Sequence, residues 1–169
     1  MSDDQSLIPS AIAVLAATPS VMREMLVPLS DELVAAQGSE GWSARDVVAH
    51  LAARQHPAII GRVSAVLAEN GAVIPDIPDD LMEVEPYRAR PLEDLLREFE
   101  DGRAEAVALL KRIPPEQLQW RGVHSGVGEI SIADIIHHVA YHDLVHVAQA
   151  ARLAYAPLEP LRGAMRVFR

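Results

Sequence analysis

Histidine is the residue of this chain best suited to chemistry, and three histidines recur at a helical spacing in its last third. His138, His142 and His146 follow one another at intervals of four residues. On an α-helix each such interval turns the side chain by only about 40° around the axis. His142 and His146 can therefore place two imidazole nitrogens on one divalent metal ion, the geometry of H-x-x-x-H metal sites. The spacing alone equally admits His138.

The residues around His142 and His146 exclude one class of metal enzyme. Asp143, rather than a glutamate, follows His142, so the metalloprotease sequence H-E-x-x-H is excluded. A single helical histidine is usually a surface residue or a hydrogen-bonded core residue, and His56, His124 and His137 are interpreted in this way. Several buried imidazoles, in contrast, need a compensating partner. A shared metal ion would be such a partner.

His50 stands on a different helical segment, seven residues after Ser43, just as His138 stands seven residues after Ser131. If the two helices are antiparallel, His50 meets the later helix at a single level. The sequence does not fix that level.

Four long segments with an apolar period near 3.6 residues supply the helices that must position these histidines. The second and fourth begin at Ser43 and Ser131, and an aspartate follows each serine three residues later, which predicts capping boxes. No segment has the convincing alternation of a strand. We therefore expect an all-α four-helix bundle, a single domain over residues 1–169, with a long crossover connection between its second and third helices. The segments cover residues 9–36, 43–70, 91–112 and 131–155.

Prolines and a glycine interrupt these segments. Pro19 follows a potential N-cap, Thr18, and predicts either two consecutive helices or one helix broken near Thr18. Pro57 lacks the N–H that would bond to Ala53, so the second helix should kink or divide there. Gly102 weakens the third helix locally.

The connections carry further expectations. Short helical turns are expected after Ser30 and over residues 79–85. The proline-rich connection of residues 71–91 and the glycine-rich loop of residues 122–128 are expected to border a pocket.

The composition excludes several classes of protein. A net charge of −9 opposes binding of nucleic acid through phosphate contacts. The absence of cysteine excludes disulfides, thiolate ligands and a cysteine nucleophile. No stretch of about 18 uncharged apolar residues is present to span a membrane, and the acidic N-terminus lacks the basic start of a signal peptide. We expect a cytoplasmic protein with a small-molecule substrate and no nucleic-acid or membrane partner.

Two motifs resemble the DinB/YfiT-like family. Residues 41–51, GWSARDVVAHL, are similar to its W-S-x-x-(E/D)-x-x-x-H-L element, and residues 141–149, YHDLVHVAQ, to its H-D-x-x-H-x-x-Q element. The resemblance implies a four-helix bundle that holds one divalent metal ion, nickel or zinc, through three histidines. Matched by motif, the ligands are His50, His142 and His146. His138 has no ligand role in that pattern and remains a pocket residue.

The resemblance also implies an activity. Three neutral ligands leave an open coordination position and acidify whatever binds there, either water or a thiol. Relatives in this family include hydrolases and enzymes that transfer low-molecular-weight thiols such as bacillithiol or mycothiol, and they often form homodimers. Asp143 either orients an imidazole or accepts a proton, with a plain surface position as an equal alternative. Tyr141 and Gln149 are weaker pocket candidates.

Two competing interpretations remain open. The chain could be a non-catalytic, stress-associated metal-binding bundle in which the ion mainly joins the second and fourth helices. It could also be a protein-interaction bundle without metal.

Overall fold

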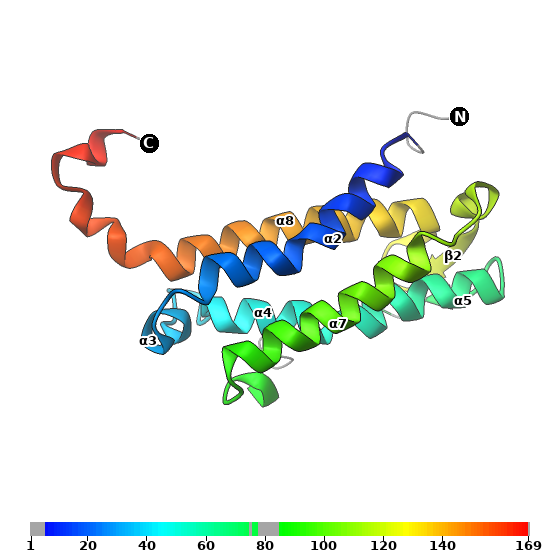
Figure 1. The fold of residues 1–169 in the computed structure, drawn as a ribbon. Coiled ribbons are helices and arrows are strands. Elements are labelled where there is room, and N and C mark those ends of the chain that lie inside the picture. Colours follow the sequence, from blue (N-terminus) through cyan, green and yellow to red (C-terminus); the bar gives the residue numbers. More distant parts are fainter. Residues whose placement is uncertain (1–5, 75, 78–84, 169) are drawn as a thin grey trace.

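A bundle of four long helical segments makes up most of the molecule (Figure 1). The computed structural model describes residues 6–74, 76–77 and 85–168. α2 and α8 run in one direction and the other two segments in the opposite one, so the chain must cross the length of the bundle between α5 and α7. The expected bundle and its long crossover are confirmed. The segments are α2 (Ile8–Leu26), α4 (Ala44–Ala53) with α5 (Arg62–Ala68), α7 (Leu92–Leu110) and α8 (Ile132–Tyr155).

The two expected capping boxes are present at the starts of α4 and α8. Asp46 N donates to Ser43 Oγ at 3.1 Å, and Ser43 N donates to Asp46 Oδ2 at 2.9 Å. The same reciprocal pair joins Ser131 and Asp134 at 3.0 and 2.7 Å. Both helices that carry the candidate histidines therefore begin at a position set by local hydrogen bonds.

Pro19 does not break α2, so both expectations for this region are wrong. The helix continues from Ile8 to Leu26 with Pro19 inside it. A proline has no N–H to donate to the carbonyl four residues earlier, which is that of Leu15. Leu15 O instead accepts a hydrogen bond from Arg103 Nη1 at 2.8 Å. A partner on another helix thus compensates the bond that Pro19 cannot make.

Pro57 divides the second segment, as predicted. α4 ends at Ala53, a π-helix η1 follows over Gln55–Gly61, and α5 begins at Arg62. π-helical turns are rare and often accompany functional sites.

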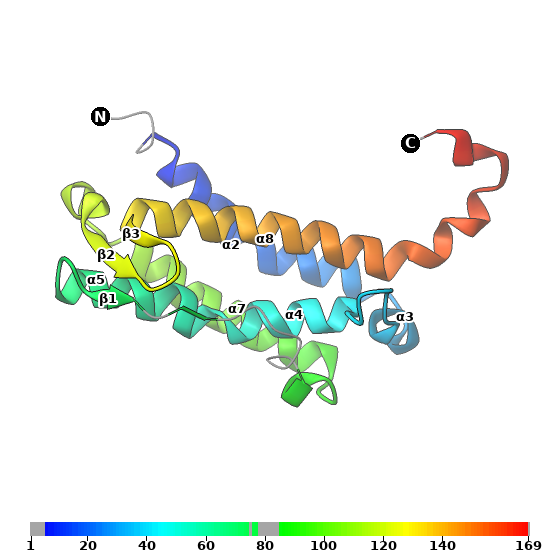
Figure 2. The same cartoon turned by 180° about the vertical axis from the view of Figure 1, so that it is seen from behind.

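A small three-stranded sheet corrects the expectation that the chain has no strand. β1 (Val73–Ile74) pairs in parallel with β2 (Arg121–His124), which pairs antiparallel with β3 (Gly128–Ser131). A Cβ on Gly122 would collide with the side chain of Ile74, so only glycine allows this approach. The sheet joins the start of the crossover to the loop before α8, at the α5 end of the bundle (Figure 2).

The remaining elements are short. α3 (Asp31–Ala35) is the helical turn expected after Ser30, whose Oγ accepts from Leu33 N. A 3₁₀ turn covers Glu85–Tyr87, and the turn expected over residues 79–85 lies almost wholly outside the described residues. Further 3₁₀ turns are η3 (Pro115–Gln119), η4 (Ala156–Leu158) and η5 (Pro160–Val167), the last two leading away from the bundle (Figure 1).

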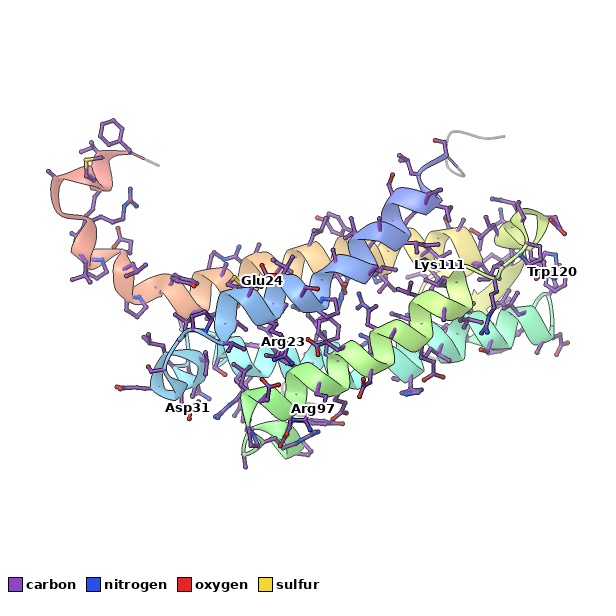
Figure 3. The ribbon with its side chains drawn as sticks, viewed as in Figure 1. Arg23, Glu24, Asp31, Arg97, Lys111 and Trp120 are labelled. Atoms are coloured by element: carbon purple, nitrogen blue, oxygen red, sulfur yellow. The ribbon has the colours of Figure 1, made fainter. Side chains whose placement is uncertain are left out.

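An ion-pair cluster on the outside of the bundle joins α2 to α7 (Figure 3). The guanidinium of Arg23 contacts Glu93 Oε2 at 2.7 Å and also pairs with Glu100. The hydrogen bond from Arg23 lowers the pKa of the Glu93 carboxyl. All three side chains are partly exposed, and exposed pairs contribute little to stability.

The apolar core consists of two clusters. One surrounds Ile59, Val63 and Ile136, and the other surrounds Leu51, Leu96 and Phe99. Polar side chains that are almost fully buried lie between them, among them Gln55, Arg103 and Asp143. Within the part of the chain that the structure describes, no helix is both long and apolar enough to cross a membrane.

Candidate metal centre

Three imidazoles from two antiparallel helices converge on one point. His50 projects from α4, and His142 and His146 project from consecutive turns of α8. His142 Nε2 lies 3.3 Å from His50 Nε2 and 3.1 Å from His146 Nε2. One nitrogen from each of the three lies within 4.8 Å of the others. This is the level of contact between the helices that the sequence left open.

These separations fit a shared metal ion. Nitrogens bound to one ion at about 2.0–2.1 Å with angles of about 90–109° lie roughly 2.8–3.4 Å apart. The two closest Nε2 pairs, at 3.1 and 3.3 Å, fall in that range. His50 is only 1% exposed, so a ligand there would be shielded from solvent on the α4 side.

Protons alone explain the cluster less well. Each ring nitrogen carries either one proton or one lone pair. Because His142 Nε2 lies close to both other Nε2 atoms, a single N–H···N bond accounts for only one of its two contacts. A cation accepts lone pairs from all three nitrogens at once.

Gln149 and Trp42 orient two of these rings. Gln149 Oε1 lies 2.7 Å from His146 Nδ1. An amide oxygen only accepts, so Nδ1 carries the proton and Nε2 presents its lone pair to the common point. Trp42 packs edge-on against His50, with ring centroids 5.6 Å apart. The sequence placed Gln149 in a pocket, whereas its observed contact is with a candidate ligand.

Asp143 is fully buried, which excludes the surface position considered for it. Its carboxylate forms a bidentate ion pair with Arg103, in which Nη2 donates to Oδ1 at 3.1 Å. Both of its oxygens accept hydrogen bonds from the guanidinium. The contacts of Asp143 therefore join α8 to Arg103 on α7.

A cavity of about 390 Å³ adjoins the histidines. His142 belongs both to the triad and to its wall, and His138 lines it with its ring centroid 6.0 Å from that of His142. As expected, both loops border it, the crossover through Asp76 and Ile77 and the glycine-rich loop through Val127.

His124 is one of the cavity residues to which the sequence analysis gave no site role. Its side chain is largely buried on β2, and its Nδ1 accepts from Gly126 N at 3.1 Å. The neutral ring therefore carries its proton on Nε2, 3.8 Å from Asp76 Oδ1. Its position in a glycine-rich loop, outside any helical period, gave no signal.

Asp134, the residue that caps α8 together with Ser131, also lines the cavity. Burial raises the pKa of its carboxyl, but the hydrogen bonds from Ser131 N and Oγ lower it, and the net pKa lies below the usual value. Tyr141 is 70% exposed on α8 and does not line this cavity. His56 and His137, assigned no function from the sequence, lie outside both the triad and the cavity wall.

Comparison with known proteins identifies the family of the chain. The sequence model of the DinB superfamily matches residues 15–150. The chain belongs to the DinB superfamily. The matched range contains all three histidines of the triad, the whole of α4, α5 and α7, and most of α2 and α8.

Individual relatives have names that refer to metal. Two proteins of Oceanobacillus iheyensis, named "Putative metal-dependent hydrolase OB0413" and "Putative metal-dependent hydrolase OB0782", are 29% and 28% identical to this chain. The alignments cover 74% and 80% of this chain and 72% and 78% of those proteins. YfiT from Bacillus subtilis, described as "a probable metal-dependent hydrolase with an unusual four-helix bundle topology", matches with a TM-score of 0.80 and 20% identity, over 93% of this chain and 90% of YfiT. The YfiT match establishes the fold.

Proposed function

We propose that this protein is a metal-dependent enzyme that acts on a small molecule through one divalent ion held by His50, His142 and His146. The observation that carries the proposal is the position of His142, which belongs to both the triad and the wall of the cavity. A volume of about 390 Å³ is in the range of small-molecule pockets. The names of the two Oceanobacillus relatives support the same class.

The chemistry follows from the donor set. Three neutral imidazoles would hold nickel or zinc with its charge uncompensated and one position open, so that a bound water or thiol is acidified. The apolar wall, which includes Ile59, Ile135 and Val139, keeps bulk water from the substrate. His138, one turn before His142 on that wall, is placed to exchange a proton with a bound molecule. Hydrolysis and transfer of a low-molecular-weight thiol are the two reaction types that this arrangement serves.

The test begins with elemental analysis of protein purified without an affinity tag or chelator. The metal-loaded protein is then screened for turnover on ester and amide substrates, and on electrophiles with a low-molecular-weight thiol. His50→Ala should abolish turnover with a modest change in melting temperature. His56→Ala, with a side chain 70% exposed outside the cavity, is the control and should keep full turnover.

Other outcomes would contradict the proposal in distinct ways. A large fall in melting temperature for His50→Ala, with no turnover found in the unaltered protein, would favour an ion that only joins α4 to α8. Metal content at trace level would favour a bundle without metal.

A further inference from the structure

Arg103 occupies an unusual position for a charged residue. It lies on α7, is 2% exposed, and sits in the polar layer between the two apolar clusters. Its guanidinium makes four hydrogen bonds, to Gln55 Oε1, Leu15 O and both oxygens of Asp143. These acceptors belong to η1, α2 and α8 respectively. One side chain on α7 therefore contacts each of the other three segments of the bundle.

Three irregular positions of the helices lie around this guanidinium. Pro19 leaves Leu15 O available inside α2. The π-helix around Pro57 contains Gln55, whose Oε1 accepts from Arg103 Nε at 2.8 Å. Gly102 leaves space for the Gln55 side chain, because a Cβ at position 102 would lie 2.9 Å from both Cβ and Cγ of Gln55. All three irregular positions therefore adjoin groups that bind the Arg103 guanidinium.

The partners of Arg103 are next to the candidate ligands. Asp143 directly follows His142 and precedes His146 by three residues, so its ion pair fixes the rotation of α8 where both ligands are carried. Gln55 follows His50 by five residues, and its Nε2 donates to Leu51 O at 2.6 Å in the turn that contains His50. Arg103 thus holds both ligand-bearing segments against α7.

We propose that Arg103 is a positioning residue for the metal centre, which sets the separation between His50 and the His142–His146 pair. The inference rests on the proposed metal site. A displacement of about 1 Å between α4 and α8 would take one imidazole beyond bonding distance of an ion held by the other two. Partners behind metal ligands commonly change metal affinity about 10–100-fold when they are removed.

The principal test is zinc affinity of the double variant Arg103→Met/Asp143→Leu, measured by competition with a chromophoric chelator on metal-free protein. Removing both members of the ion pair leaves the net charge beside the histidines unchanged, so a lost affinity reports geometry. We expect zinc binding to weaken at least about tenfold. The control is Leu110→Ala, a buried truncation on the same helix that should lower the melting temperature and keep zinc affinity within about twofold.

Gly102→Ala provides a second variant, because every charge and every ligand stays in place while Gln55 is displaced. Zinc affinity should fall several-fold, and this variant decides if the double variant does not fold. If the double variant folds and binds zinc within twofold of the unaltered protein, the positioning role is overturned while the metal site stands. If the double variant does not fold, the same result in Gly102→Ala overturns the positioning role. Absence of zinc binding in the unaltered protein would overturn the metal site together with this inference.

Discussion

Removal of Arg103 should leave the buried Asp143 carboxylate without a counter-ion and lower the free energy of unfolding. A second substitution, at Asp143, should restore most of that free energy. In Arg103→Met, the Asp143 carboxylate loses its counter-ion at a fully buried position. Breaking one side of a buried ion pair costs about 3–5 kcal/mol. Gln55 Oε1 and Leu15 O each lose a donor as well, at about 1 kcal/mol each. The expected loss of unfolding free energy is about 5–7 kcal/mol, a large part of the ~5–15 kcal/mol typical of a domain.

Adding Asp143→Leu should reverse most of that loss. The second substitution removes the unpaired charge, and apolar replacement of both members of a buried pair is often neutral or stabilising. Only the two neutral acceptors remain unpaired, so the double variant should be about 2–4 kcal/mol more stable than Arg103→Met. At about 2–4 °C per kcal/mol for a chain of this size, the melting temperature should rise by roughly 4–16 °C.

The assay is thermal and urea unfolding followed by helical circular dichroism, with chelator present so that metal binding does not contribute. A double variant less stable than Arg103→Met would refute the reasoning. It would show that Asp143 is not left as an uncompensated charge when Arg103 is removed.

The remaining predictions concern residues around the site and at its margins. Gln149→Ala removes the acceptor of His146 Nδ1–H and should weaken zinc binding about tenfold with little change in melting temperature; an unchanged affinity would show that the ring is oriented without it. The pKa of Asp134 is lower in the folded chain than its unfolded value of about 3.9, so its contribution is present above that pH and is lost as the pH falls through the folded pKa. The unaltered protein should therefore be more stable than Asp134→Asn at neutral pH, by roughly 0.5–1 kcal/mol for a partly exposed capping group, and this difference should vanish in acid. Urea unfolding at several pH values measures the difference. A difference that does not change with pH would contradict the role of Ser131 as donor. Arg23→Gln removes the exposed cluster with two glutamates of α7 and should cost several-fold less unfolding free energy than Arg103→Met; a comparable loss by urea unfolding would show that exposure is not what separates the two arginines.

Local signals in the sequence predicted the parts of the fold that local interactions determine. The capping boxes at Ser43 and Ser131 involve residues three apart, and both formed. Pro57 divided its helix, as its missing N–H predicts, and a π-helix replaces the α-helix over Gln55–Gly61. Pro19 did not divide its helix, since Arg103 on α7 donates to the carbonyl that Pro19 leaves without its usual bond. Arg103 lies 84 residues after Pro19 in the sequence. The effect of a proline thus depended on tertiary contacts that periodicity does not report.

The same limit applies to the site. The spacing of His142 and His146 was sufficient to pair them, while the choice of His50 over His138 depended on motifs rather than on helical geometry. The position of Arg103 could have been recognised from the sequence. It stands four residues after Phe99 and four before Val107, on the apolar face of its helix. A charged residue at such a position predicts a buried partner. The small sheet and His124 gave no comparable signal, since strands of two to four residues are too short to show alternation.

Anomalous diffraction from crystals of zinc- or nickel-loaded protein, recorded at the metal absorption edge, tests the central claim most directly. The account predicts one strong peak about 2.0–2.1 Å from the Nε2 atoms of His50, His142 and His146, with His138 outside bonding distance. A peak bonded to His138 in place of His50, or no peak at the triad in protein shown to contain metal, would contradict it.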